Sequence, residues 1–319
     1  MARESLIQVE NLTVRYPGSK EPILRDVSLT LYHGEITCVI GESGCGKSTM
    51  FHAIEQLPGR VVIDSGSVSF RGRNLQDMSK SELRALRGRS IGVVFQEPGA
   101  SLDPIRKIWV QFYEAMRAHD PAVTKAQARE RAAEILRSME FTDPERILDN
   151  CPAQLSGGMN QRVAIAMAMV LNPEVLLADE PTSALDVTVQ AQIVNELMLL
   201  TERFGTCILL ITHNMGVVAK MAHRVAVMYG GRIIEYGPKN AVLSAPKHPY
   251  TKARLAAIPR LDGQPPTGIP GKKPDVFPAV GCAFAPRCSR SCEACKTAAM
   301  TRRVVEGEHW TMCQEVELP

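Results

Sequence analysis

The chain has few aromatic residues, no extended basic segment and no long apolar run. Aromatic residues make up 5% of the 319 residues, too few to suggest a surface on which nucleic-acid bases stack. The net charge is +3, with Lys and Arg mixed among nearly as many acidic residues, so no basic surface for nucleic acid or lipid is expected. The longest apolar stretch, residues 163–178, is interrupted by Asn172-Pro173-Glu174 and is too short to cross a bilayer.

No N-terminal stretch combines a charged start with an apolar core, so we expect no signal peptide. We expect a soluble chain that takes part in a membrane process only through partners. The hydrophobic content of 45% is sufficient for one large or two modest domains with a real core.

Cysteines are unevenly distributed. Four of the nine are isolated, and the other five lie within the last 40 residues: Cys282, Cys288, Cys292, Cys295 and Cys313. In a reducing cytosol such a cluster favours a metal site over disulfides.

Residues 41–49 read Gly-Glu-Ser-Gly-Cys-Gly-Lys-Ser-Thr and form a complete phosphate loop between a strand-like segment and a helical one. Glycines at 44 and 46 allow backbone N–H groups to approach the β- and γ-phosphates of a nucleotide, and the next helix adds a favourable dipole. Lys47 is expected to contact the phosphate oxygens and Ser48 to bind Mg²⁺. The predicted nucleotide-binding residues of the loop are Ser43, Gly44, Cys45, Gly46, Lys47, Ser48 and Thr49, with no separate chemistry expected from the Cys45 thiol.

A second motif lies about 110 residues later. Residues 155–161 read Leu-Ser-Gly-Gly-Met-Asn-Gln, and an apolar segment then ends in Asp179 and Glu180. Asp179 is expected to hold Mg²⁺, and Glu180 to act as the general base that polarises the attacking water. The alternative, a solvated acidic strand end, is disfavoured by the accompanying phosphate loop.

The periodicity predicts an α/β fold. Alternating segments in residues 5–40 indicate strands, and the apolar segments 175–179 and 207–212 are typical of a buried parallel sheet. Residues 97–152 have a helical pattern, in which Thr124 and Gln127 fit a capping box. Residues 225–236 predict a hairpin. Prolines beyond residue 245 predict an irregular tail.

Together the two motifs resemble the ATP-binding-cassette (ABC) ATPases. The resemblance implies a RecA-like core with an antiparallel β subdomain, a helical insert and a small irregular Cys-rich C-terminal extension. We expect an ATPase domain over residues 1–245, with its helical subdomain at about 97–165, and an extension over residues 246–319.

The resemblance also assigns single residues. Gln96, after the Phe95 strand end, matches the family's glutamine loop, which contacts Mg²⁺ and water. His213 matches the switch histidine at the γ-phosphate, and Tyr16 matches the aromatic residue that stacks on adenine. In each case the alternative is an ordinary surface or strand-end residue.

In this family the loop that contains Ser156, Gly157 and Gly158 caps ATP bound to a facing subunit, and residues 183–186 match the loop between the two sites. One cassette per chain therefore implies a dimer with two composite sites.

Further segments resemble the ATPases of bacterial oligopeptide, dipeptide and nickel importers, in particular the cysteine-tailed first ATPase of a pair. These segments are 155–167, His248-Pro249-Tyr250-Thr251 and 281–288. The implied partners are a second ATPase, two permeases and a substrate-binding protein, at the cytoplasmic face of the inner membrane. Cargo stays open among peptides, nickel complexes, glutathione and other small solutes. The alternatives are an ABC ATPase acting on ribosomes or nucleic acid, and a metal- or redox-sensing regulator.

The tail cysteines are candidate metal ligands. Cys282, Cys288 and Cys295 have the spacing C-x5-C-x6-C, and Cys313 follows after 17 residues. Four thiolates suit a [4Fe–4S] cluster or tetrahedral Zn²⁺. The importer resemblance implies the cluster, in a structural role, and leaves Cys292 as the spare thiol.

Overall fold

A computed structural model describes residues 3–97, 101–183, 185–258, 266–274 and 276–315. Ala184, in the expected communicating loop, lies outside the described residues. The chain divides into two compact units. Unit 1 holds residues 1–8, 30–36 and 68–211, and unit 2 holds residues 9–29, 37–67 and 212–319. Within the described ranges, we find no helix whose length and apolar character would let it cross a membrane.

Three N-terminal strands contribute residues to both units. They are β1 (Ser5–Arg15), β2 (Leu24–Tyr32) and β4 (Val62–Phe70), and with β5 (Arg73–Asn74) they follow the order β2-β1-β4-β5. Alternate apolar side chains of β2, such as Val27 and Leu31, are fully buried, which explains the period of two in this segment. The strands expected in residues 5–31 are confirmed.

Unit 1 contains a buried parallel sheet in the order β8-β7-β6. Its strands are β6 (Ile91–Val94), β7 (Val175–Asp179) and β8 (Cys207–Ile211). Residues 175–178 and 207–211 are almost completely buried, so these strands have apolar runs rather than alternation. Unit 1 also contains η1 (Leu75–Asp77), α2 (Lys80–Leu86), η3 (Pro152–Gln154) and α7 (Val187–Phe204).

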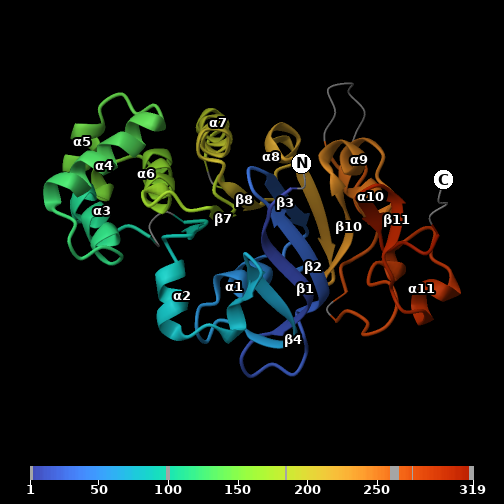
Figure 1. Cartoon of the computed structure of the whole chain (residues 1–319). Coiled ribbons are helices and arrows are strands. Elements are labelled where there is room, and N and C mark those ends of the chain that lie inside the picture. The colour runs from blue at the N-terminus through green and yellow to red at the C-terminus, as the bar shows by residue number, and fades with distance from the viewer. Residues whose placement is uncertain (1–2, 98–100, 184, 259–265, 275, 316–319) are drawn as a thin grey trace. The chain divides into compact units, whose positions relative to one another are not determined.

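The expected helical segment forms a group of helices in unit 1, drawn in green in Figure 1. Its members are α3 (Ile108–Arg117), α4 (Lys125–Ser138), α5 (Pro144–Asp149) and α6 (Gly157–Met169). The predicted capping box is confirmed, since the Thr124 hydroxyl accepts from the Gln127 N–H and the Gln127 side chain accepts from the Thr124 N–H. Buried Arg162 joins α6 to α7, because its Nε donates to Glu196 Oε1 at 2.5 Å.

Unit 2 contains the strand order β11-β12-β10-β9-β3. β3 (Ile36–Gly41) is parallel to β9 (Arg224–Tyr229), and β9 forms the predicted hairpin with β10 (Arg232–Pro238). The helices of unit 2 are α1 (Lys47–Glu55), α8 (Met215–Met221), α9 (Lys239–Ser244), α10 (Pro249–Ala256), η4 (Ala285–Arg287) and α11 (Glu293–Thr297).

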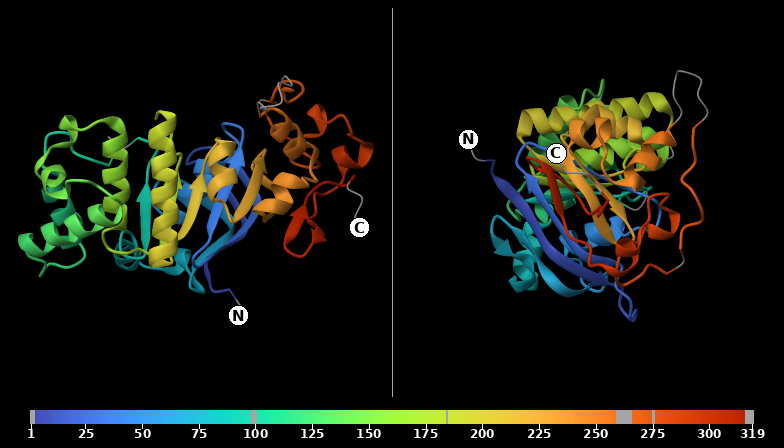
Figure 2. Two further views of the ribbon diagram at one scale, coloured as in Figure 1. Left: turned by 90° about the horizontal axis from the view of Figure 1, so that it is seen from above. Right: turned by 90° about the vertical axis from the view of Figure 1, so that its right-hand side faces the viewer.

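The tail is more regular than its prolines predict. Pro249 occupies the start of α10, where a helix needs no N–H donor, so it begins a helix rather than breaking one. β11 (Arg303–Glu306) and β12 (His309–Thr311) form a hairpin that adds to β10. Figure 2 shows these orange and red segments together in both views. The prediction of an irregular tail is therefore wrong for these elements.

One buried carboxylate fixes the tail to β10. Glu235 is fully buried, and its oxygens accept hydrogen bonds from the N–H groups of Lys247 and His248 at 2.7 and 2.9 Å. His309 Nε2 lies 2.8 Å from the same carboxylate. These partners compensate the cost of burying a charge, and they join the start of α10 to the last hairpin.

Candidate nucleotide site

The phosphate loop, residues 41–49, links β3 to α1 within unit 2. Gly46 has φ 104°, in the left-handed region, and a Cβ there would stand 2.6 Å from Leu24 Cδ2. Position 46 therefore requires glycine for both conformation and space. Cys45 is buried in the core, and burial raises the pKa of its thiol.

Lys47 folds back over the loop that precedes it. Its Nζ donates to the carbonyl oxygens of Gly41 and Glu42, both at 3.0 Å, and the residue is 7% exposed. The ammonium is thus held against the loop whose N–H groups are suited to phosphate. Ser43, Gly44 and Ser48 are exposed beside it. The loop combines one buried cation with accessible backbone and hydroxyl groups, which is the chemistry that a nucleotide phosphate requires.

Tyr16 lies next to this loop. Its hydroxyl is 3.0 Å from the Thr49 Oγ1 in the first turn of α1, while the residue is 42% exposed. An exposed ring anchored to the phosphate loop at one end can offer its face to a planar base. The structure therefore places the Tyr16 ring beside the phosphate loop, and both are predicted to bind the nucleotide. His213, also in unit 2, is exposed and stands two residues beyond β8.

In unit 1 the acidic pair and Gln96 share one edge of the parallel sheet. Val94 of β6 is in register with Ala178 of β7, and Gln96 and Asp179 follow at the carboxyl ends of these strands. This edge is where ligands bind in open α/β sheets. Gln96 is exposed, and Asp179 is half-buried.

Glu180 has an unusual backbone conformation. Its φ is 46°, in the left-handed region that non-glycine residues seldom occupy. Two hydrogen bonds hold it there: its N–H donates to the Ile211 carbonyl at 2.9 Å, and its carbonyl accepts from the Ser183 N–H at 3.0 Å. Such local strain is typical of functional positions, and here it turns the chain sharply at the end of β7.

The Ser-Gly-Gly loop, residues 155–161, starts α6. The Ser156 hydroxyl accepts from the Met159 N–H at 3.2 Å, which makes Ser156 the N-cap of the helix. Ser156 and Gly157 are exposed, and a Cβ on Gly157 would meet no atom within 4 Å. Gly158 is buried instead, with a position for Cβ only 2.5 Å from Val189 Cγ1 of α7.

The tail cysteines lie around one small cavity in unit 2. Cys282, Cys288, Cys295 and Cys313 line it together with His248, whose Nε2 is 4.0 Å from the Cys282 Sγ. Across the described ranges, no group of three His, Cys, Asp or Glu side chains is arranged to hold a metal ion. Zinc needs four ligands within about 2.3 Å of one point, so the zinc alternative finds no support. The same finding gives no support to a [4Fe–4S] cluster, which stays an expectation from the sequence.

Sequence reasoning gave no site role to three residues that contact the phosphate loop. Tyr250 Oη accepts from the Glu42 N–H at 3.0 Å, Lys273 Nζ donates to the Ser43 carbonyl at 2.8 Å, and Arg287 donates to the Glu42 carboxylate. Tyr250 lies in the His-Pro-Tyr segment that the sequence singled out, although nothing there indicated its partner.

The comparisons with known proteins bear on this geometry directly. A family model described as "ABC transporter" matches residues 24–183, and a model described as "Oligopeptide/dipeptide transporter, C-terminal region" matches residues 234–295. The chain is an ATP-binding subunit of the ABC transporter family. The second match places it in the branch that carries the oligopeptide/dipeptide transporter C-terminal region, as the sequence resemblance implied.

Relatives of this ABC ATPase extend over almost its whole length. A probable peptide ABC transporter ATP-binding protein of Sinorhizobium fredii is 40% identical, over 97% of this chain and 94% of its own. A dipeptide transport ATP-binding protein of Escherichia coli is 39% identical, over 92% and 91%.

Solved structures share the fold. The ATP-binding cassette MJ0796, described as a dimer in a post-hydrolysis state with ADP and phosphate, is 31% identical, with TM-score 0.65 over 73% of this chain and 99% of its own. CbiO1 of Clostridium perfringens, part of an ABC transporter complex, is 28% identical, with TM-score 0.66 over 81% and 96%. The predicted RecA-like α/β core and ABC-type ATPase activity are thus confirmed at the level of the family.

Proposed function

We propose that this chain is the ATP-hydrolysing subunit of a bacterial importer for peptides or related small solutes. The observation that carries the proposal is the phosphate loop with buried Lys47, in a chain that also has the oligopeptide/dipeptide transporter C-terminal region. Relatives named for peptide and dipeptide transport favour this over an ABC ATPase acting on ribosomes or nucleic acid. We assign residues 1–245 to the ATPase domain, with its helical subdomain at about 97–165, and residues 246–319 to the extension.

In the proposed reaction, Lys47 and the loop N–H groups bind the β- and γ-phosphates, and Tyr16 stacks on adenine. Glu180 orients a water and accepts its proton as the water attacks the γ-phosphorus, and His213 contacts the γ-phosphate. The balance is ATP plus water to ADP plus phosphate. Mg²⁺ would neutralise phosphate charge. As residues that offer it oxygen ligands we propose Ser48 of unit 2, and Gln96 and Asp179 of unit 1.

Ser156, Gly157 and Gly158 are proposed to act on ATP held by another subunit. The exposure of Ser156 and Gly157 at the start of α6 supports this role, because free N–H groups at a helix N-terminus attract anions. The proposed partner is a second homologous ATPase. Two permeases and a substrate-binding protein complete the assembly, which would hold the chain at the cytoplasmic face of the inner membrane.

The tail is proposed to hold a [4Fe–4S] cluster through Cys282, Cys288, Cys295 and Cys313. Their positions around one cavity support this assignment, and Cys292, with its Sγ 3.5 Å from that of Cys295, would be the spare thiol. The cluster would have a structural role. Iron and sulfide analysis of anaerobically purified protein, with Cys292→Ser as the matched variant, distinguishes it from zinc.

The test of the proposed function is Glu180→Gln in the assembled complex. The amide keeps the shape of the side chain but cannot accept a proton, so we expect kcat to fall by about 10²- to 10⁴-fold while ATP still binds. Phosphate release and equilibrium nucleotide binding are measured in parallel. Exposed Glu202→Gln, on α7, is the matched control. Turnover of Glu180→Gln equal to that of wild type would remove Glu180 from the base role.

A further inference from the structure

We propose that the C-terminal extension is part of the nucleotide site: Tyr250, Lys273 and Arg287 hold Glu42 and Ser43, and so preorganise the phosphate loop for ATP. The inference rests on the proposed nucleotide-binding function of this loop. The three residues are positioning residues, since they act on the nucleotide through the loop. All five residues lie in unit 2.

Glu42 is held at both its backbone and its side chain. Its N–H donates to Tyr250 Oη at 3.0 Å, and its two carboxylate oxygens accept from Arg287 Nη1 at 3.0 and 3.2 Å. The Glu42 carbonyl also accepts from Lys47 Nζ at 3.0 Å. A shift of Glu42 would therefore move a hydrogen-bond acceptor of the lysine that binds phosphate.

The residues that hold Glu42 are themselves fixed. The Arg287 side chain is 6% exposed, its Nε donates to the Pro270 carbonyl at 2.7 Å, and its Nη1 is 3.2 Å from the Tyr229 hydroxyl. Tyr250 is completely buried, with its ring centroid 4.6 Å from that of Tyr229. Surface ion pairs contribute little because their side chains are mobile and solvated, whereas this pair is buried on the arginine side and oriented by other groups.

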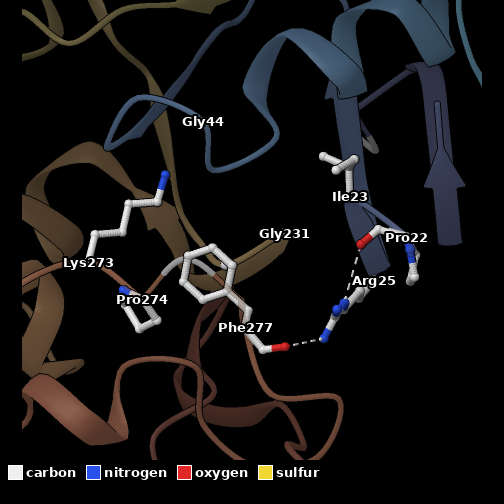
Figure 3. Close-up of a pocket in the computed structure, with 9 residues that line it drawn as sticks. Pro22, Ile23, Arg25, Gly44, Gly231, Lys273, Pro274 and Phe277 are labelled. Carbon is white, nitrogen blue, oxygen red and sulfur yellow. Dashed lines mark hydrogen bonds between the residues drawn. The ribbon is translucent and has the colours of Figure 1, made fainter. Parts of the chain in front are cut away.

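Lys273 contacts Ser43, the loop residue that follows Glu42. Its Nζ donates to the Ser43 carbonyl at 2.8 Å, and a Cβ on Gly44 would stand 3.0 Å from that nitrogen. Figure 3 shows the Lys273 side chain directed at the loop around Gly44. The ammonium adds positive charge beside backbone N–H groups that are suited to phosphate, which strengthens the local attraction for an anion.

A cavity of about 380 Å³ adjoins this contact, lined by Gly44, Lys273 and Phe277 among others. Arg25, on the opposite wall, is fixed to the extension. It donates to the Phe277 carbonyl at 3.3 Å (Figure 3) and to the Pro278 carbonyl at 2.7 Å. The extension thus forms one wall of a space that opens beside the phosphate loop.

Preorganisation predicts a specific energetic pattern. If Arg287 acts through Glu42, removing either partner loosens the loop, and removing the second partner adds little. We expect Arg287→Gln and Glu42→Gln each to raise the Kd for a fluorescent Mg²⁺–ATP analogue about tenfold, and the double variant to match the single ones. Arg287→Lys should recover part of the affinity, because it restores the charge without the planar fork.

Lys273→Ala should raise the same Kd about threefold, and exposed Lys272→Ala is its matched control. Binding is measured on the full chain, with far-ultraviolet circular dichroism and thermal midpoints recorded for every variant. If the Arg287 variants fail to fold, Glu42→Gln still tests the inference, because it changes the loop and leaves the extension intact.

Wild-type affinity in Glu42→Gln and Arg287→Gln, or fully additive losses in the double variant, would overturn the inference. Failure of the underlying function has a different signature, in which wild type binds no analogue or Lys47→Ala binds as well as wild type. Binding that depends on Lys47 but not on Glu42 and Arg287 would therefore reject the role of the extension alone.

Discussion

The phosphate loop and the Ser-Gly-Gly loop both start helices and both carry glycines, yet they are supported differently. Glu42 and Ser43 of the phosphate loop are held by residues 208 to 245 positions away in the sequence. Ser156 of the Ser-Gly-Gly loop is held by Met159, three residues away, and Gly157 next to it is exposed. The long-range support of the first loop fits the proposal that it binds nucleotide within its own chain. The exposure of the second fits the proposal that it acts on nucleotide held by another subunit.

The largest expected effect tests the first half of this comparison. Lys47→Ala removes the cation from the phosphate loop, and hydrogen bonds to charged groups contribute about 1.5–3 kcal/mol each. We expect Kd for the Mg²⁺–ATP analogue to rise about a hundredfold, as measured by fluorescence titration. Exposed Lys20→Ala, in the same unit, controls for the loss of one positive charge. An unchanged Kd would mean that the lysine is not part of the nucleotide site.

Two adjacent glycines test the second half of the comparison. Gly158→Ala places a methyl group 2.5 Å from Val189 Cγ1, on a stiff β-branched side chain, so α6 and α7 must shift. We expect a loss of about 1–3 kcal/mol in the free energy of unfolding, measured by urea denaturation. Gly157→Ala meets no atom within 4 Å and should leave stability almost unchanged.

The same Gly157→Ala variant should nevertheless lower ATP hydrolysis by the assembled complex, because it places a methyl group on the surface that we propose faces the partner's nucleotide. Binding of nucleotide to the isolated chain should stay at its wild-type value. Equal loss of stability in the two glycine variants would contradict the distinction between an exposed and a packed position.

The last effect concerns the buried pair Arg162 and Glu196, which joins α6 to α7. Burial raises the pKa of Glu196 from 4.5 to about 7, although Arg162 opposes the shift. The folded state therefore binds this proton more tightly than the unfolded state does. The resulting stability is fully present below pH 4.5 and is lost as the pH rises through about 7. We expect the free energy of unfolding of wild type, relative to Glu196→Gln, to fall over this range in urea titrations. A pH-independent difference would contradict the raised pKa.

Local elements were predictable because their determinants are adjacent in the chain. The phosphate loop needs a strand, two glycines and a helix in succession, and the capping box at Thr124 needs a partner only three residues away. The buried strands 175–179 and 207–211 were equally clear from their apolar runs. Family resemblance then supplied roles for Gln96, Tyr16 and His213 that spacing alone does not.

Other features depend on tertiary structure. Pro249 has the same sequence signature whether it breaks a segment or begins a helix. In the structure it begins one, directly after Lys247 and His248, whose N–H groups donate to Glu235. The left-handed backbone of Glu180 depends on the Ile211 carbonyl, which no local pattern reveals. The partnership of Glu42 with Arg287 spans 245 residues, so no periodicity or spacing rule could have indicated it.

That separation has a consequence for the order in which the protein is made. Arg287 is synthesised 245 residues after Glu42. At about 5–20 residues per second, roughly 12–50 s of translation separate the two side chains. During that interval the phosphate loop exists without the arginine that pairs with it. The phosphate loop therefore gains this support only after residue 287 has been synthesised.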